Sequence, residues 1–396
     1  MRILIYSQYF KPETNAAANK TSDIASFLAK ENQVEVMTGF PNHPLGKMIG
    51  NYKIKWLMLE KNDNLKIWRN FLIIPKKANL KIWRYLNYFS FAFSSFINLL
   101  FMKKPDVLIV SSPPISILIL AFIYTKLFKI KLVVDLRDLW PEAAISLNFV
   151  KRNIFINILE KLVNSSYHYA SKIFINTLAF KDILINKYLI RDNKIIYIPN
   201  GFDIENNLNI KNQLKRNDFN FKVFYSGLFG FAQNVNLIIE TAKLCEDIQF
   251  FLIGDGPLKK QLVDKVNSLN ISNVRIFDYQ KKEDLFCLIN ECDLGLITYE
   301  INDTFRKNIP SKIFDYMFLN KPVLINLEGE ASRLIKDGDF GFVIETNDPK
   351  VLSEKLNNIK DNDKLVEKGN NGFKYLQKNF DKKFLLDQLL KEIQNI

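Results

Sequence analysis

The sequence predicts an α/β protein with two doubly wound domains, each a parallel sheet covered by helices on both faces. Short runs rich in Val, Ile and Phe alternate with helical segments along the chain. The alternation begins again at Lys222, after a polar and charged connector at 205–220. The chain has 396 residues, 48% of them hydrophobic, which is enough for more than one core.

The expected strands are short apolar runs that end in polar or glycine-containing loops. In the first domain, 1–200, they are Arg2–Ser7, Val34–Thr38, Leu65–Arg69, Asp106–Ser112, Lys131–Asp138, Lys172–Thr177 and Lys194–Gly201. In the second domain, 201–378, they are Lys222–Gly227, Ile248–Gly254, Asn273–Asp278, Asp293–Tyr299, Lys321–Asn326 and Gly341–Glu345. Ligands of such sheets bind beyond the carboxyl ends of the strands.

Several functional classes lose support. Cys245, Cys287 and Cys292 have no metal-binding spacing and are typical of reduced core residues in a cytosolic protein. Only two histidines are present, which argues against a zinc site. No G-x-G-x-x-G follows the first strand and no Walker lysine loop occurs, so dinucleotide and ATP binding are disfavoured. The apolar run at the N-terminus is too short for a signal peptide.

The net charge is +13, and much of it lies in the segment 46–104. Twelve Lys or Arg stand there against Glu60 and Asp63, a difference of +10, together with three of the four tryptophans. This composition favours an anionic membrane surface. A solvated basic face and nucleic-acid binding remain alternatives, although no nucleic-acid motif accompanies the charge. Within the segment, 85–102 is uncharged; we expect a buried or membrane-facing helix, with a true span left open.

The stretch "IPSKIFDYM" (309–317) indicates an anion site at the start of a helix. Pro310 keeps the chain extended, Ser311 is a suitable N-cap, and Lys312 would be the first helical residue. Free backbone N–H groups and the helix dipole favour a phosphate there. Asp315 lies on the same face and could accept hydrogen bonds from a sugar hydroxyl. The alternative is a solvated lysine and an aspartate that only complements the dipole.

Two glycine loops follow strands of the second domain. Gly227 and Gly230 in "YSGLFGFAQN", which ends near Gln233, let bare backbone approach a phosphate, and Gly254 in "IGDGP" occupies a similar turn. Purely structural turns are the alternative.

Polar side chains also follow strands of the first domain. The stretch "DLRDLWPE" places Arg137, Asp138 and Glu142 at a strand end, which suggests substrate handling or, alternatively, an arginine–carboxylate network that stabilises the turn. Residues 9–17 after the first strand and His43 in a later loop are further candidates.

Taken together, "SQYFKPETNAAA", "TGFPNHPLGK", "SSPP", "DLRDLWPE", "IPNGFD", "YSGLFGFAQN", "IGDGP" and "IPSKIFDYM" occur in order across almost the whole chain. This set resembles the bacterial family 4 retaining glycosyltransferases, in a branch similar to N-acetylfucosaminyl- and colanic-acid-type transferases. The resemblance implies a GT-B fold with an interdomain cleft, no metal and no other cofactor. It also implies that the terminal amphipathic helix, 379–396, packs back on the N-terminal domain.

The resemblance implies specific roles. The donor, a nucleotide-diphosphate sugar with UDP favoured, would be bound by Gly227, Gly230, Gln233, Gly254, Tyr279, Ser311, Lys312 and Asp315. The catalytic group would comprise Arg137, Asp138 and Lys312, and the acceptor side Glu13, Asn15, His43 and Glu142. The acceptor would be a polyprenyl-diphosphate-linked glycan in O-antigen, capsule or exopolysaccharide synthesis. The protein would be cytoplasmic and peripheral on the inner face of the membrane, bound through 46–104, with no nucleic-acid partner.

The chain departs from the family pattern at four places. Asp315 stands where glutamate is usual, Lys307 replaces a second glutamate eight positions earlier, and Leu228 replaces the asparagine of the phosphate loop. The histidine that many relatives have near Asp138 is absent. The missing acid at Lys307 leaves an inactive binding subunit as an alternative function. A nucleotide-sugar 2-epimerase, which shares the two-domain fold, is the other alternative, although the acid and histidine pattern of such enzymes is absent.

Overall fold

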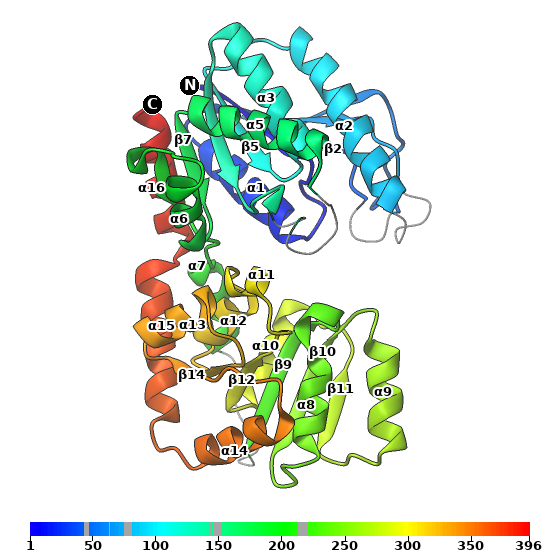
Figure 1. The fold of residues 1–396 in the computed structure, drawn as a ribbon, viewed down its shortest axis with the longest axis vertical. Helices are drawn as coiled ribbons and strands as arrows, with labels where there is room; N and C mark the ends of the chain where they lie inside the picture. The colour runs from blue at the N-terminus through cyan, green and yellow to red at the C-terminus, as the bar shows by residue number, and fades with distance from the viewer. Residues whose placement is uncertain (43–46, 63, 75–80, 143–144, 146–151, 213–220) are drawn as a thin grey trace. The chain divides into compact units, whose positions relative to one another are not determined.

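The computed structural model describes the chain except for residues 43–46, 63, 75–80, 143–144, 146–151 and 213–220 (Figure 1). The chain divides into two compact units. Unit 1 comprises Met1–Pro199 and Leu386–Ile396, and unit 2 comprises Asn200–Leu385. The division after Pro199 lies one residue from the predicted boundary, whereas the return to unit 1 begins inside the C-terminal helix.

Unit 1 contains an eight-stranded sheet among its described residues, in the order β3-β4-β2-β1-β5-β6-β7-β8. The strands are β1 (Arg2–Tyr6), β2 (Gln33–Gly39), β3 (Leu57–Asn62), β4 (Leu65–Asn70), β5 (Val107–Ser112), β6 (Lys131–Leu136), β7 (Lys172–Ile175) and β8 (Ile195–Tyr197). Neighbouring strands are parallel, except that β3 runs antiparallel to β4 at the edge. Residues that alternate along β1 supply two separate cores, one on each face of the sheet.

Helices cover both faces of this sheet (Figure 1). One face packs against α2 (Lys81–Phe101), α3 (Ile115–Phe128), α5 (Ile154–Tyr169) and α6 (Ala179–Asn186). The other packs against α1 (Ala16–Leu28) and the C-terminal part of α16 (Lys382–Gln394). Leu389 and Ile393 of α16 are buried in the same cluster as Ile3 and Ile5 of β1. The last helix thereby completes the hydrophobic core of unit 1.

Unit 2 has a parallel sheet of six strands among its described residues, in the order β11-β10-β9-β12-β13-β14. The strands are β9 (Lys222–Leu228), β10 (Gln249–Asp255), β11 (Val274–Phe277), β12 (Leu294–Ile297), β13 (Val323–Ile325) and β14 (Gly341–Val343). The chain proceeds outward from β9 to β11 and then from β12 to β14, so the strand order reverses between β9 and β12. Such a switch point is the usual ligand site of an open α/β sheet.

The helices of unit 2 alternate with its strands. They are α7 (Ile204–Asn212), α8 (Val235–Ala242), α9 (Lys259–Ser268), α10 (Lys282–Asn290), α11 (Asp303–Arg306), α12 (Lys312–Phe318), α13 (Glu330–Asp337), α14 (Pro349–Lys360) and α15 (Leu365–Asn379), with short 3₁₀ turns η1 (Asp192–Lys194) in unit 1 and η2 (Phe231–Gln233) in unit 2. The predicted connector, 205–220, therefore begins as helix α7, and its remainder, 213–220, lies outside the described residues.

Each predicted strand appears within a few residues of its expected position, but the sequence did not predict β3 (Leu57–Asn62). The uncharged stretch 85–102 forms most of α2, a single helix. Within the described parts of the chain, the helices are too short or too polar to cross a membrane.

A cluster of charged side chains lies at the carboxyl end of β6. Asp135 is 2% exposed and forms an ion pair with Lys20 of α1 at 3.1 Å, while Ser111 Oγ donates to it at 3.3 Å. Lys20 Nζ also donates to Ile198 O at 2.9 Å. Burial alone would raise the pKa of Asp135, but the cations Lys20 and Arg137 lower it below its ordinary value. The pair therefore ties α1 to the sheet edge.

We expect Lys20→Met to lower the free energy of unfolding of unit 1 by about 3 kcal/mol, because Asp135 would stay buried without its main counter-charge. All four tryptophans, Trp56, Trp68, Trp83 and Trp140, belong to unit 1, so urea unfolding followed by tryptophan fluorescence reports on this unit. The exposed Lys30→Met is the control and should be nearly neutral. Equal stability of Lys20→Met and the wild type would contradict the structural role of the pair.

Candidate functional site

A cavity of about 320 Å³ lies at the carboxyl ends of the central strands of unit 2. It is at the switch point between β9 and β12, where an open α/β sheet is expected to bind its ligand. Its lining comes from the ends of four strands, β9 to β12, and the segments that follow them: Ser226, Gly227, Leu228, Gln233, Ile253, Gly254, Tyr279, Gln280, Leu285, Tyr299, Pro310, Ser311, Lys312 and Asp315. The cavity is thus built from loops that lie far apart in the sequence.

Two glycines bring bare backbone into this cavity. Gly227 has φ +131° and Gly254 has φ +157°, a region that residues with a side chain rarely adopt. A Cβ on Gly254 would lie 1.8 Å from Gly227 O, and a Cβ on Gly227 would lie 3.1 Å from Lys312 Nζ. Both positions therefore require glycine, one for the packing of β9 against β10 and one for the approach of Lys312.

Lys312 brings its side-chain amino group to the cavity, and no acidic residue of the described part of the chain pairs with it. Its Nζ lies 3.5 Å from the centroid of the Tyr225 ring, which is a close cation–π contact. Among the described residues no carboxylate forms an ion pair with it. Burial holds the pKa of Lys312 well below its ordinary value. A cation in this situation would gain most from an anionic ligand.

Asp315 lines the same cavity one turn further along α12. Burial raises the pKa of its carboxyl to about 6, although the cation Lys282 partly offsets this. Lys282 lies over the rings of Phe202 and Phe286, and its own pKa is lowered by burial. Asp315 therefore presents a carboxyl group that is available to accept hydrogen bonds from hydroxyl groups of a ligand.

A buried tyrosine of α12 holds the carboxyl-terminal end of β9 in place. Tyr316 OH lies 3.0 Å from the Ser226 backbone N and 3.1 Å from Ser226 Oγ. Tyr316 also packs edge-to-face on Phe224, with ring centroids 4.5 Å apart. Helix α12 thereby sets the position of the Gly227 backbone as well as that of Lys312.

The structure brings the residues predicted to bind the donor together, with one exception. All of them line the cavity except Gly230. Gly230 lies close to Gln233, since a Cβ built on it would be 2.5 Å from Gln233 Oε1. Ser311 precedes α12 as predicted but makes no capping hydrogen bond, and its side chain is exposed. Sequence reasoning missed Tyr225 and Tyr299, since aromatic residues in strands and near their ends give no signal beyond that of core residues.

The segment before α12 contains Lys307, at the position where the resemblance implies an acidic residue. Lys307 is exposed and ends the short helix α11. Its neighbour Arg306 makes two hydrogen bonds of 2.7 Å to the carboxylate of Glu345. The pair between Arg306 and Glu345 thus holds this segment in place. The adjacent Phe305 stacks on Tyr299, with ring centroids 5.4 Å apart. Tyr299 is the residue of this stacked pair that lines the cavity.

The candidate catalytic residues of unit 1 lie just after β6. Burial raises the pKa of Asp138 to about 6, while the Leu139 backbone N–H and the Trp140 side chain act in the opposite direction. Arg137 donates to Ala16 O at 2.7 Å and lies 3.8 Å from Asp135. The structure thus places Arg137 in the network that stabilises this turn, which was the alternative interpretation, and leaves Asp138 with a perturbed carboxyl group.

The described members of the predicted acceptor side each have hydrogen-bond partners within unit 1. Glu13 is 2% exposed, and its Oε1 accepts the Asn42 backbone N–H at 2.9 Å. Asn15 caps α1 by accepting the Ala18 N–H at 2.8 Å. Glu142 accepts hydrogen bonds from Lys187 and Tyr188. His43 lies outside the described residues.

Polar residues of α2 also reach the loop after β1, which the sequence did not predict. Gln8 Nε2 donates to Asn87 Oδ1 at 2.6 Å, and Asn87 Nδ2 donates to Ile73 O at 2.8 Å. Both side chains are buried. The loop that carries Glu13 is therefore anchored on α2.

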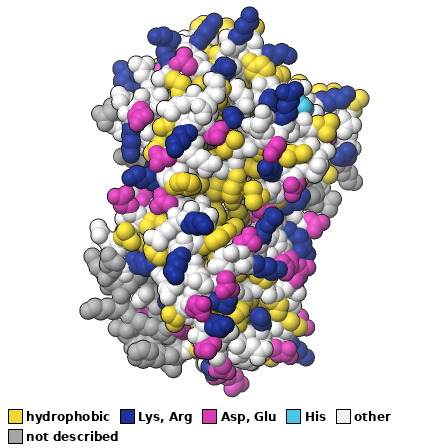
Figure 2. All heavy atoms as spheres, turned by 90° about the vertical axis from the view of Figure 1, so that its left-hand side faces the viewer, with side chains coloured by type: hydrophobic (Ala, Val, Ile, Leu, Met, Phe, Trp, Pro, Cys, Tyr) yellow, Lys and Arg dark blue, Asp and Glu magenta, His cyan; other side chains and the backbone are white. Residues whose placement is uncertain are grey.

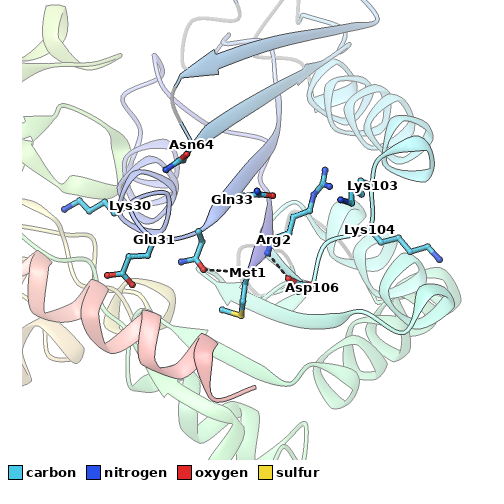
Figure 3. A pocket seen from close by; sticks show the side chains of 10 residues that line it. Met1, Arg2, Lys30, Glu31, Gln33, Asn64, Lys103, Lys104 and Asp106 are labelled. Atoms are coloured by element: carbon cyan, nitrogen blue, oxygen red, sulfur yellow. Dashed lines mark hydrogen bonds between the residues drawn. The ribbon is translucent and has the colours of Figure 1, made fainter.

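A second and larger hollow, of about 520 Å³, lies in unit 1 at the amino ends of its strands (Figure 3). Its lining comes from the amino ends of strands and the ends of helices, and includes Arg2, Lys103 and Lys104. The amino group of Met1 donates to Asn32 Oδ1 at 3.2 Å, and the backbone N of Arg2 donates to Asp106 at 2.8 Å (Figure 3). Ligands of parallel sheets bind at the carboxyl ends, so we assign the functional site to the cavity beside Lys312 despite its smaller volume.

We expect Gly227→Ala to weaken binding of a nucleoside diphosphate about tenfold or more, since the positive φ and the contact with Lys312 both oppose a side chain. Isothermal titration with UDP measures this effect. Gly50→Ala is the matched control, because Gly50 also has a positive φ (+76°) but belongs to unit 1 and does not line the cavity. Equal loss of affinity in both variants would show that strain, and not the approach of Lys312, is responsible.

Two family descriptions match the chain. "Glycosyltransferase Family 4" matches residues 21–206, and "Glycosyl transferases group 1" matches residues 206–374. Together they cover most of the chain, and they divide it close to the boundary between the two units.

Similar proteins carry related names. The putative colanic acid biosynthesis glycosyl transferase WcaI of Escherichia coli K12 is 23% identical over 412 residues, which covers 100% of both chains. An uncharacterized glycosyltransferase of Methanocaldococcus jannaschii is 25% identical over 246 residues, 60% of this chain and 64% of that relative. A chitobiosyldiphosphodolichol beta-mannosyltransferase of Dictyostelium discoideum is 26% identical over 199 residues, 46% of this chain and 40% of that relative.

Solved structures share the fold at low sequence identity. Anabaena HepE in complex with UDP has a TM-score of 0.69 at 17% identity, and 100% of each chain is covered. WaaG, described as a glycosyltransferase involved in lipopolysaccharide biosynthesis, has a TM-score of 0.65 at 15% identity and 98% coverage of each chain. These structural matches, the two family descriptions and the paired Rossmann-like units agree. The chain belongs to glycosyltransferase family 4 and has the GT-B fold.

Proposed function

We propose that this glycosyltransferase moves a sugar from a nucleotide-diphosphate sugar to a lipid-linked glycan, with retention of anomeric configuration and without a metal ion. The observation that carries the proposal is Lys312, which stands beside the bare backbone of Gly227 and has no described acidic partner. The donor belongs to unit 2, and the residues that act on the acceptor belong to unit 1.

The donor diphosphate takes the place of the missing counter-charge. Lys312 leaves the Tyr225 ring for the phosphates, and backbone N–H groups near Gly227 and Gly254 donate to phosphate oxygens. Asp315 accepts hydrogen bonds from the ribose hydroxyls, and the base lies toward Tyr279 and Gln280. The residues proposed to contact the donor all line the same cavity: Gly227, Gly254, Tyr279, Gln280, Lys312 and Asp315.

We favour UDP as the nucleotide. Anabaena HepE, which shares the fold, was crystallised with UDP and with UDP-glucose. The names of WcaI and WaaG refer to colanic acid and to lipopolysaccharide biosynthesis, and two relatives are named for a glycan linked by diphosphate to dolichol. These names support a role in assembling a cell-surface polysaccharide on a lipid carrier, with an N-acetylated hexosamine or a deoxyhexosamine as the sugar.

In the reaction, the bond between the sugar C1 and the diphosphate oxygen breaks, and a bond from C1 to the acceptor oxygen forms on the same face. The acceptor proton passes to the leaving phosphate. Negative charge grows on the diphosphate as it leaves, so the cation at Lys312 and the oriented N–H groups stabilise the transition state more than the bound donor. Asp138 orients the acceptor hydroxyl.

A lipid-linked acceptor places the enzyme at a membrane. We propose that it works at the inner face of the cytoplasmic membrane, where the basic aromatic segment 46–104 attracts anionic headgroups. The protein is then peripheral, because its contact with the bilayer is electrostatic and interfacial.

We expect Lys312→Met to abolish the stabilisation of unit 2 by UDP. A ligand at 100 times its dissociation constant stabilises a fold by about 2.7 kcal/mol, and without Lys312 the diphosphate loses its main counter-charge. Thermal unfolding with UDP, GDP and their sugar conjugates measures the effect, and the exposed Lys260→Met is the control. An unchanged shift in Lys312→Met would contradict the proposed donor site.

The same samples separate the alternative functions when they are incubated with donor and a lipid-linked acceptor in the presence of EDTA. A glycosyltransferase forms a longer glycan, a 2-epimerase releases an epimerised sugar without acceptor, and a binding subunit turns over nothing.

We expect the rate of transfer to depend on the ionisation of Asp138. Its pKa is raised to about 6, so the carboxylate form increases from pH 5 to pH 7, and kcat/KM should rise through this range and level off above it. Asp138→Asn should remove this step, whereas the exposed Asp264→Asn should retain it. A pH profile of Asp138→Asn that matches the wild type would exclude this role.

A further inference from the structure

Helix α2 buries both of its asparagines and two of its serines against the rest of unit 1, together with Phe91, Ala92 and Leu99. Asn87, Ser94, Ser95 and Asn98 are all buried against the rest of unit 1. Each has a hydrogen-bond partner there: Ser94 Oγ donates to Phe71 O at 2.6 Å, Ser95 Oγ lies 2.6 Å from Tyr6 OH, and Asn98 Nδ2 donates to Asn70 Oδ1 at 2.7 Å. The polar residues that make the sequence look unsuited to a membrane therefore do not face outward.

The outward face of the same helix is apolar along its length. Phe89 is 63% exposed, Phe93 is 64% exposed and Phe101 is 87% exposed. Ile82, Tyr85, Leu86 and Leu100 are exposed beside them. Scattered exposed apolar residues need no explanation, but a continuous aromatic stripe on one helix marks an interaction surface. Trp56 extends the stripe, since its ring lies 6.4 Å from that of Phe93 and is 47% exposed.

The neighbouring helices continue this surface. α3 packs between α2 and α5 on the same face of the sheet (Figure 1). Although α3 is apolar on all sides, Ile123 and Leu127 are exposed to solvent. In α5, Ile154, Phe155 and Ile158 are exposed as well. A helix that is apolar on all sides is expected to be buried, so the exposed apolar residues of this layer are suited to a further contact.

Cations predominate around this layer. The sequence from Leu65 to Pro105 contains no Asp or Glu, and Arg84 near one end of α2 and Lys103 and Lys104 after the other are exposed. The one acidic residue of α5, Glu160, forms an ion pair with Lys187. By contrast, Lys and Arg are interspersed with Asp and Glu on the side of the molecule shown in Figure 2. Cations around an apolar stripe complement an anionic lipid surface.

We infer that the outer face of α2, α3 and α5 lies flat in the interface of an anionic bilayer, with the aromatic stripe of α2 among the headgroups. This deepens the proposed membrane-bound acceptor: docking uses a surface of three helices, which includes α3 and α5 outside the segment 46–104. A second copy of the chain would face the same cations with its own, since the contact would repeat the same surface. Charge therefore favours lipid over self-association.

The test is cosedimentation of the whole chain with vesicles of phosphatidylcholine alone and of phosphatidylcholine mixed with phosphatidylglycerol. The double variant Phe89→Ser, Phe93→Ser should bind the mixed vesicles at least about tenfold more weakly than wild type, because two apolar side chains leave the interface. The matched control is Val366→Ser, Phe384→Ser, which removes exposed apolar residues from α15 and α16. This control should bind like wild type.

The charge requirement is tested separately. Each of Arg84→Gln, Lys103→Gln and Lys104→Gln should weaken binding about fivefold at low salt. Quenching of tryptophan fluorescence by brominated lipid should diminish in Trp56→Phe, because Trp56 lies beside the stripe.

Unchanged vesicle binding by Phe89→Ser, Phe93→Ser would overturn the inference. So would a wild-type dimer, in the absence of lipid, that this variant converts to a monomer, because the face would then be an interface between copies. The UDP-induced thermal shift is measured in the same samples. A variant that keeps this shift but no longer binds vesicles shows that membrane docking failed while the proposed donor site in unit 2 stayed intact.

Discussion

The site depends on one positive charge that has no described acidic partner. Lys312 rests on the ring of Tyr225, and burial lowers its pKa. An aspartate or glutamate beside it would stabilise the empty protein but would compete with a diphosphate for the same cation. The glycine backbone at Gly227 and Gly254, and the buried Tyr316 that fixes the loop after β9, make sense as supports for this cation. The free protein therefore gives up an ion pair that a phosphate ligand can supply.

The two units have the same kind of sheet but present different surfaces to ligands. Unit 2 gathers glycine backbone, one lysine and one carboxyl group at its switch point, which suits a charged and soluble donor. Unit 1 uses its charged residues to fix the loops after its strands, as the Lys20–Asp135 pair and Arg137 illustrate. It also turns the polar side of α2 inward and presents aromatic residues outward. The transfer that we propose, from a soluble donor to a membrane-bound acceptor, would use both kinds of surface.

Much of the fold, and most of the residues that line the candidate donor site, could be predicted from the sequence, because their signals are local. Buried parallel strands are continuous apolar runs, and glycines after a strand followed by a proline–serine–lysine helix start indicate where a phosphate binds. The edge strand β3 was missed because it is antiparallel, partly polar and paired on one side only. The engagement of Arg137 with Ala16 O and of Glu142 with Tyr188 depends on contacts between distant segments, which residue types do not encode. The orientation of α2 was hidden for the same reason: its asparagines and serines find partners inside unit 1 only after folding.

The most direct test of the central claim is a crystal structure of the chain with UDP. We predict that the diphosphate lies in the cavity of unit 2, with Lys312 Nζ moved from the Tyr225 ring to within hydrogen-bond distance of a phosphate oxygen, and with backbone N–H groups near Gly227 facing the same phosphates. A diphosphate bound elsewhere, for example in the hollow lined by Arg2, Lys103 and Lys104 at the amino ends of the unit 1 strands, would contradict the account.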